Sequence, residues 1–107
     1  MDPAPLTLDE WIALDPTTNR RRLVALIARI NAYATQQRAA RTAEIQRTWA
    51  DCPDVFTAEY NARRNIEAAE SRVSEMCEQV FAVAMWDAYG VTDASGAAAT
   101  ALLAQES

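Results

Sequence analysis

The chain has 107 residues, 50% of them hydrophobic and 23% charged, and its formal net charge is −5. This composition is that of one folded globular domain, and its acidic balance disfavours nucleic acid as a partner because phosphates repel it. The chain contains neither His nor Lys, so it lacks the commonest general base and the usual amine nucleophile. All ten positively charged residues are Arg, which we attribute to a GC-rich genome. We expect a protein that is not an enzyme.

The start of the chain, Met1 to Leu14, has no positively charged region of the kind that begins a secretory signal. The longest wholly apolar run, residues 80–86, is far shorter than the ~20 residues that a membrane-spanning helix needs. The two cysteines, Cys52 and Cys77, suit a reducing compartment in which both thiols stay free. We expect a cytoplasmic protein with no membrane partner.

The first segment, residues 1–16, is predicted to be a loose arm that leads into a short amphipathic helix. Thr7 and Glu10 have the spacing of a capping box, in which the side chain of each accepts a backbone N–H of the other. Asp15 and Pro16 end this helix and begin the next, since Asp caps a helix and Pro suits its first position.

The next segment, residues 17–50, contains no Gly or Pro and repeats apolar residues at steps of three and four. This periodicity predicts one long helix, with a break near Gln36–Gln37 as the alternative. Pro53 cannot continue a helix and Asp54 can cap a new one, so a tight turn is expected there.

Residues 54–89 are predicted to form a second long helix with a heptad pattern. Its apolar seam consists of Ala62, Ile66, Ala69, Val73, Met76, Val80 and Val83. Gly90 suits a left-handed helix end, and Val91 can fold back as the accompanying apolar contact. Residues 92–107 are expected to form a short helix capped by Thr92 or Asp93, with a frayed end.

No segment shows the alternating pattern of a strand. The sequence therefore predicts an all-α fold, a long antiparallel helical hairpin with short N-terminal and C-terminal helices packed on it as a small bundle. The whole chain is expected to be a single domain.

The two long helices differ in charge. Residues 17–50 hold seven Arg and one acidic residue, a charge of +6, and residues 54–89 hold seven acidic residues and three Arg, a charge of −4. We expect the two rims to face each other, although each exposed pair contributes only ~0.2–1 kcal/mol. The Arg20–Arg22 triplet is expected to be neutralised within the molecule. The candidate electrostatic residues are Arg20, Arg21, Arg22, Arg29, Glu67, Glu70, Glu75 and Glu78.

Two pairs of glutamates, Glu67 with Glu70 and Glu75 with Glu78, have the three-residue spacing found in carboxylate-bridged metal bundles. Those bundles combine Glu with His at this spacing, and the chain has no His. Cys52 and Cys77 are isolated cysteines, and a zinc site needs several ligands at local spacing. We expect a solvated acidic face, no metal site and no cofactor.

The strongest candidates for partner contact are four aromatic residues and one methionine: Trp11, Phe81, Met85, Trp86 and Tyr89. Residues 80–86 are apolar on nearly every side of the predicted helix, so something must cover several sides. A three- or four-element core is one explanation. A second copy is the other, and we expect a homodimer through Ile66, Val73, Val80 and the patch at Phe81, Met85 and Trp86.

Two short motifs partly resemble those of the WXG-type small proteins of type VII secretion. "WAD" at Trp49–Asp51 lies where that family has Trp-x-Gly, and "YGVTD" at Tyr89–Asp93 fits Tyr-x-x-x-Asp. The glycine is missing, and the helix before Pro16 is extra. The resemblance implies a secreted helical hairpin.

From these features we expect a small protein that binds another protein, as a stoichiometric inhibitor, antagonist or adaptor of a larger complex. Such proteins are typical of phages and mobile elements. The alternatives are a nucleic-acid-binding regulator that uses the arginines of residues 17–50, and the WXG-like secreted hairpin.

Overall fold

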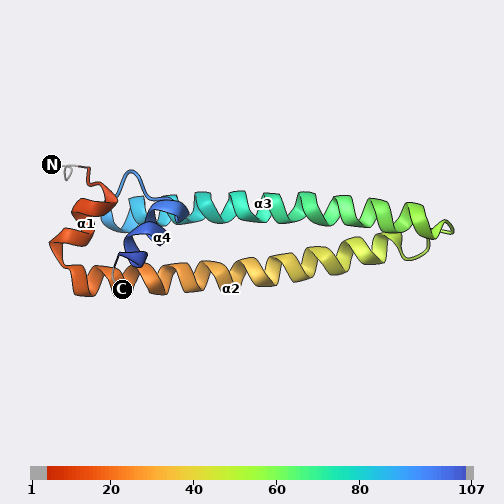
Figure 1. Ribbon diagram of the computed structural model, residues 1–107, viewed down its shortest axis with the longest axis horizontal. Helices are drawn as coiled ribbons and strands as arrows, with labels where there is room; N and C mark the ends of the chain where they lie inside the picture. Colours follow the sequence, from red (N-terminus) through yellow and green to blue (C-terminus); the bar gives the residue numbers. More distant parts are fainter. Residues whose placement is uncertain (1–4, 106–107) are drawn as a thin grey trace. The chain divides into compact units, whose positions relative to one another are not determined.

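Residues 5–105, which the computed structural model describes, contain four helices (Figure 1). They are α1 (Leu8–Leu14), α2 (Pro16–Trp49), α3 (Val55–Tyr89) and α4 (Gly96–Ala104). Over the same residues the β-structure is limited to one isolated bridge, between Leu6 and Val91. The all-α prediction is confirmed, and α2 runs through Gln36–Gln37 without a break. The predicted loose start and frayed end fall partly on residues 1–4 and 106–107, outside the described residues.

The chain forms two compact units, and each is described by itself. The capped unit comprises the residues up to Ile30 and those from Cys77 onward. It contains α1, α4, the first part of α2 and the last part of α3. The hairpin unit comprises Asn31–Met76, which is the rest of the two long helices and the turn that joins them.

The capped unit holds the main hydrophobic core, to which all four helices contribute. The buried members are Leu8, Trp11, Ile12, Leu23, Phe81, Met85, Val91 and Ala99. Phe81 and Met85 are four residues apart on α3, so both side chains point to the same side of that helix. Burial of each large side chain stabilises the fold by roughly 1.5–3 kcal/mol, so this unit contributes most of the hydrophobic stabilisation of the chain.

The helix α1 has only 7 residues, and its start is closed by two sets of contacts. The predicted capping box is present, because Thr7 Oγ1 accepts the Glu10 amide at 3.2 Å and Glu10 Oε1 accepts the Thr7 amide at 3.0 Å. Asp93, from the far end of the chain, accepts the Leu8 amide at 2.6 Å. A carboxylate there also opposes the positive end of the helix dipole.

The end of α1 is closed by α2. Asn19 is 3% exposed, and its Nδ2 donates to the Trp11 carbonyl at 2.7 Å, one of the carbonyls that a helix end leaves without a partner. Asp15 lies between the helices, and its carboxylate accepts the Thr18 amide at 3.3 Å, as a cap of α2 should. The predicted role of Asp15 is therefore confirmed.

At the end of α3, Gly90 has φ 71°, in the left-handed region, and Val91 is buried. Both agree with the sequence analysis. The start of the last helix was predicted wrongly, because Ser95 rather than Thr92 or Asp93 is the cap, its hydroxyl accepting the Ala98 amide at 3.1 Å. Asp93 is engaged on α1 and Thr92 donates to the Leu6 carbonyl.

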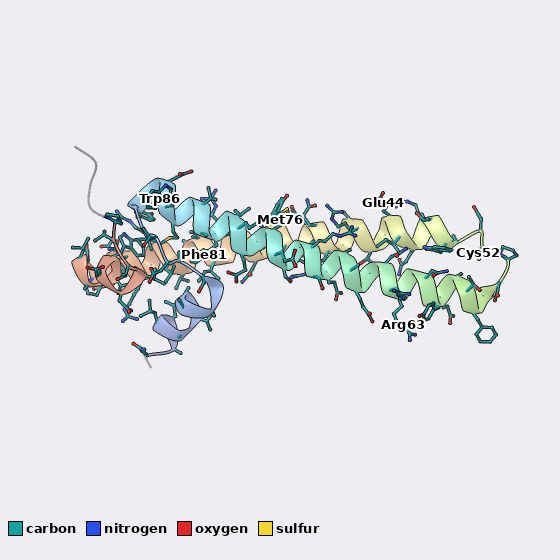
Figure 2. The ribbon with its side chains drawn as sticks, turned by 90° about the horizontal axis from the view of Figure 1, so that it is seen from above. Glu44, Cys52, Arg63, Met76, Phe81 and Trp86 are labelled. Carbon is teal, nitrogen blue, oxygen red and sulfur yellow. The ribbon has the colours of Figure 1, made fainter. Side chains whose placement is uncertain are left out.

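In the hairpin unit, the two long helices run antiparallel on either side of a tight turn at Cys52 (Figure 2). Its buried hydrophobic residues are Ala34, Ala69 and Val73. Two of the three are alanines, which bury little apolar surface, so this unit has much less hydrophobic stabilisation than the capped unit.

Asp54 begins α3, as predicted. Its carboxylate accepts the Thr57 hydroxyl at 2.8 Å and the Phe56 amide at 3.0 Å. The hydrogen bonds from the Thr57 side chain, then from its backbone, hold the pKa of Asp54 below its ordinary value of 3.8. The ionised carboxylate therefore stabilises the start of α3 above that pH, and the contribution is lost as the pH falls through the lowered value.

We predict that Asp54→Ala lowers the melting temperature by a few degrees at pH 7, since the cap of α3 is lost. The difference between the variant and the unchanged protein should shrink as the pH falls below 3.8 and through the lowered pKa of Asp54, because the carboxylate becomes protonated in the folded protein as well as in the unfolded chain. Circular dichroism melts from pH 7 to pH 2 measure this difference. A difference that stays constant down to pH 2 contradicts the assignment.

Candidate functional site

The aromatic and sulfur-containing residues predicted to bind a partner divide into buried and exposed groups. Trp11, Phe81 and Met85 are 3%, 4% and 0% exposed, so they belong to the core of the capped unit. Trp86 is 52% exposed, and in Figure 2 it lies on the side of α3 away from α4. Since α1 and α4 cover the other side, the predicted patch is a surface only in part.

The predicted self-association seam divides in the same way. Val73 is buried within the hairpin unit and Ile66 is half-buried, whereas Val80 is 45% exposed. An interface through Val73, Phe81 and Met85 is therefore not accessible in this fold. Val80, Val83 and Trp86 remain on the surface of the capped unit.

Tyr89 is half-buried and belongs to an internal stack. Its ring centroid lies 4.6 Å from that of Trp11. The Arg22 guanidinium lies over the Tyr89 ring, with Cζ 5.8 Å from the ring centroid. Arg22 Nη1 also donates to Asn19 Oδ1 at 3.1 Å. The stack joins α1, α2 and the end of α3, so Tyr89 and Arg22 have structural roles.

Arg20 and Arg22 of the triplet have partners within the molecule. Arg20 Nη1 donates to the Leu102 carbonyl at 3.2 Å, near the end of α4, where the helix dipole favours a positive charge. Arg21 is exposed, as is Arg29 further along α2. Glu10 and Asp15, which are acidic and close to the triplet in the sequence, cap helix ends.

The hydrogen bonds of Glu10 with Thr7, from its backbone amide first and its hydroxyl second, hold the pKa of this carboxyl below its ordinary value. The carboxylate is thus kept ionised by its own helix start rather than by an arginine. Sequence proximity to the triplet was a poor guide, because short-range capping geometry is satisfied first.

Among the acidic candidates, Glu78 has a defined partner. Its Oε2 accepts the Gly96 amide at 2.9 Å, at the start of α4. The α4 helix therefore has a carboxylate at its positive end and the Arg20 guanidinium at its negative end. Glu67, Glu70 and Glu75 are exposed.

The expected pairing of a basic and an acidic rim is not found. Arg20 aside, the part of the chain described has no ion pair between an arginine and a carboxylate. In the hairpin unit Arg38 crosses to α3 and donates to the Ser74 hydroxyl at 3.2 Å. Exposed ion pairs gain little over solvation, so apolar packing rather than charge matching holds the two helices together.

The sequence analysis missed a second exposed group, which lies where α3 begins. Val55, Phe56 and Tyr60 are 63%, 84% and 61% exposed, and we call them the turn patch. Tyr60 lies beneath the Arg64 guanidinium, with Cζ 5.7 Å from the ring centroid. The sequence did contain a sign that these side chains do not face α2. Phe56 and Tyr60 precede the apolar seam of α3 and fall outside its heptad register.

Among the described residues, no group of three or more His, Cys, Asp or Glu side chains is placed so that it could hold a metal ion. In residues 5–105 no helix is sufficiently long and apolar to cross a membrane. Comparison with protein-family models, curated proteins and solved structures found no match to this chain.

We predict that Glu78→Ala loosens α4, because the helix loses a carboxylate worth about 0.3–1 kcal/mol at its positive end. Cleavage by chymotrypsin within α4, at Leu102 or Leu103, should become about two- to fivefold faster. Glu75→Ala is the matched control, since the same residue type is exposed on the same helix. Equal cleavage of both variants would show that Glu78 does not hold α4.

Proposed function

We propose that this chain is a non-enzymatic protein that binds another protein through the turn patch, as an inhibitor, antagonist or adaptor of a larger complex. The observation that carries the proposal is the 84% exposure of Phe56, with Val55 and Tyr60 exposed beside it. Isolated exposed apolar residues are common on protein surfaces, but adjacent ones mark interaction sites more often.

The fold does not require these side chains to be apolar. The start of α3 is closed by Asp54, which accepts the Phe56 and Thr57 amides, so the Phe56 ring adds nothing to the cap. Burial of such a side chain in a partner would stabilise the complex by roughly 1.5–3 kcal/mol, because the ring is exposed to water in the single chain. A rigid aromatic on a helix is a good anchor because few rotatable bonds become ordered on binding.

The turn patch is best matched by a partner with an apolar pocket. Asp51, Asp54 and Glu59 flank the patch in the sequence, and these three carboxylates oppose binding to anionic lipids, whereas one arginine, Arg64, lies over Tyr60. We propose that binding takes place in the cytoplasm. Binding blocks or bridges the partner stoichiometrically, because the chain lacks the His and Lys that common catalytic sites use.

The nucleic-acid alternative is weakened by the contacts of the arginines. Arg20, Arg22 and Arg38 donate hydrogen bonds within the chain, and the candidates are divided between two units. The net charge of −5 adds repulsion of phosphate. The WXG resemblance rests on two short motifs alone.

The turn patch is tested by replacing Phe56 with a photoreactive phenylalanine analogue in the host cell and identifying the crosslinked protein. With that protein purified, Phe56→Ser should weaken binding at least about 30-fold, the loss of a hot-spot side chain worth ~2 kcal/mol. Glu59→Ser, in the same turn of α3, is the matched control and should bind as before.

The melting temperature of Phe56→Ser should be unchanged, since the ring is already exposed. If the crosslinked partner binds Phe56→Ser and the unchanged protein equally, the turn patch is not the binding surface. Crosslinks to lipid rather than to protein would contradict the proposal in favour of a membrane surface.

A further inference from the structure

A second surface lies in the capped unit, on a face that neither α1 nor α4 contributes to. Here α2 and α3 line a shallow groove of about 310 Å³. Arg22, Ala25 and Arg29 stand on the α2 side, and Ala84 and Ala88 on the α3 side. Three alanines among these residues allow another helix to approach closely, because little side chain stands in its way. We call this surface the open face.

The open face continues into exposed apolar residues on α3. Val80 lies one helical turn before Ala84 and is 45% exposed, and Val83, three residues after Val80, is 57% exposed. These are large side chains that α1 and α4 leave uncovered, although both helices pack on the same two long helices. Covering them would remove further apolar surface from water.

Charges of opposite sign lie on the two edges of the open face. Arg22 and Arg29 are both exposed on the α2 edge. Asp87 is exposed on α3 and lies three residues after Ala84, hence on the same side of that helix. A surface with a basic edge and an acidic edge can be complementary to itself.

We propose that the open face binds a second copy of the same chain, related by a two-fold axis parallel to α2 and α3. This rotation places α2 of one copy over α3 of the other. Because Arg22 lies beside Tyr89 of its own chain, it is level with Asp87, and the rotation sets it opposite Asp87 of the second copy. A two-fold axis in the plane of the face but perpendicular to the helices would place α2 over α2, with the arginines of the two copies facing each other.

The size of the open face sets the strength of this dimer. About fifteen residues of each helix give a face roughly 20 Å long and 20 Å wide. This is less than the ~800 Å² that each partner buries in a stable complex. We therefore expect a weak, reversible dimer that forms and separates with concentration.

Sedimentation equilibrium from about 5 to 500 µM tests the dimer by charge reversal. Arg22→Glu and Asp87→Arg should each weaken dimerisation at least about tenfold, since each sets like charges opposite one another. The melting temperature of each variant is measured alongside, because Arg22 also contacts Asn19 and Tyr89 of its own chain. The double variant should recover to within about threefold of the unchanged protein, because the pair is restored with its signs exchanged. Arg21→Glu is the matched control, the same charge change on the next residue, outside the groove lining.

Val83→Glu provides an independent test, because this side chain is already 57% exposed and its replacement leaves the core intact. It should abolish the dimer without lowering the melting temperature. A monomer at every concentration, a double variant no tighter than the single ones, or equal weakening by Arg21→Glu would overturn the proposal. Phe56→Ser, in the other unit, should dimerise normally, so this outcome is separate from the test of the turn patch.

Discussion

The short helices α1 and α4 cannot persist by themselves, and the capped unit depends on how their ends are closed. They have 7 and 9 residues, below the ~12–15 at which an isolated helix becomes even marginal in water. Side chains from distant parts of the chain satisfy their terminal groups. Asp93 and Glu78 accept amides at the two helix starts, and Asn19 and Arg20 donate to carbonyls at or near the two ends.

The remaining features of the capped unit follow from this closure. With α1 and α4 held in place, Phe81 and Met85 are buried, and the apolar end of α3 becomes a core on one side and a surface on the other. Arg20, one of the arginines of the triplet, donates to a carbonyl near the end of α4, where the helix dipole favours a positive charge.

Two groups of exposed apolar residues have different consequences. The turn patch in the hairpin unit consists of large side chains next to a helix start that is already capped by Asp54. The open face in the capped unit combines small residues with opposite charges, which suits a helix packed against a helix. One surface thus offers anchors for a pocket, and the other offers a flat, self-complementary face.

Features that depend on near neighbours in the chain were predictable from the sequence. The capping box of Thr7, the caps at Asp15 and Asp54 and the left-handed Gly90 all involve residues within a few positions, and all were predicted correctly. The cap of α4 was missed because Asp93 is drawn to an amide 85 residues away. The expected pairing of the two charged rims is absent because each exposed ion pair contributes only ~0.2–1 kcal/mol, less than the burial of one large apolar side chain.

Exposure was harder to predict than helix formation. Phe56 and Tyr60 lie off the heptad register, which shows that they do not face α2, but it does not show whether another segment covers them. The buried half of the predicted patch, Phe81 and Met85, could not be separated from the exposed half, Trp86. The division depends on where α4 packs, and its Ala-rich sequence carries little information about that position.

The central claim is that stability is concentrated in the capped unit, where both the large core and the closed helix ends are found. Native-state hydrogen exchange measures this directly. Amides of α2 up to Ile30 and of α3 from Cys77 onward should exchange at least about tenfold more slowly than those of residues 31–76, a difference of ~1.4 kcal/mol or more in opening. Equal or slower exchange in residues 31–76 would contradict the account.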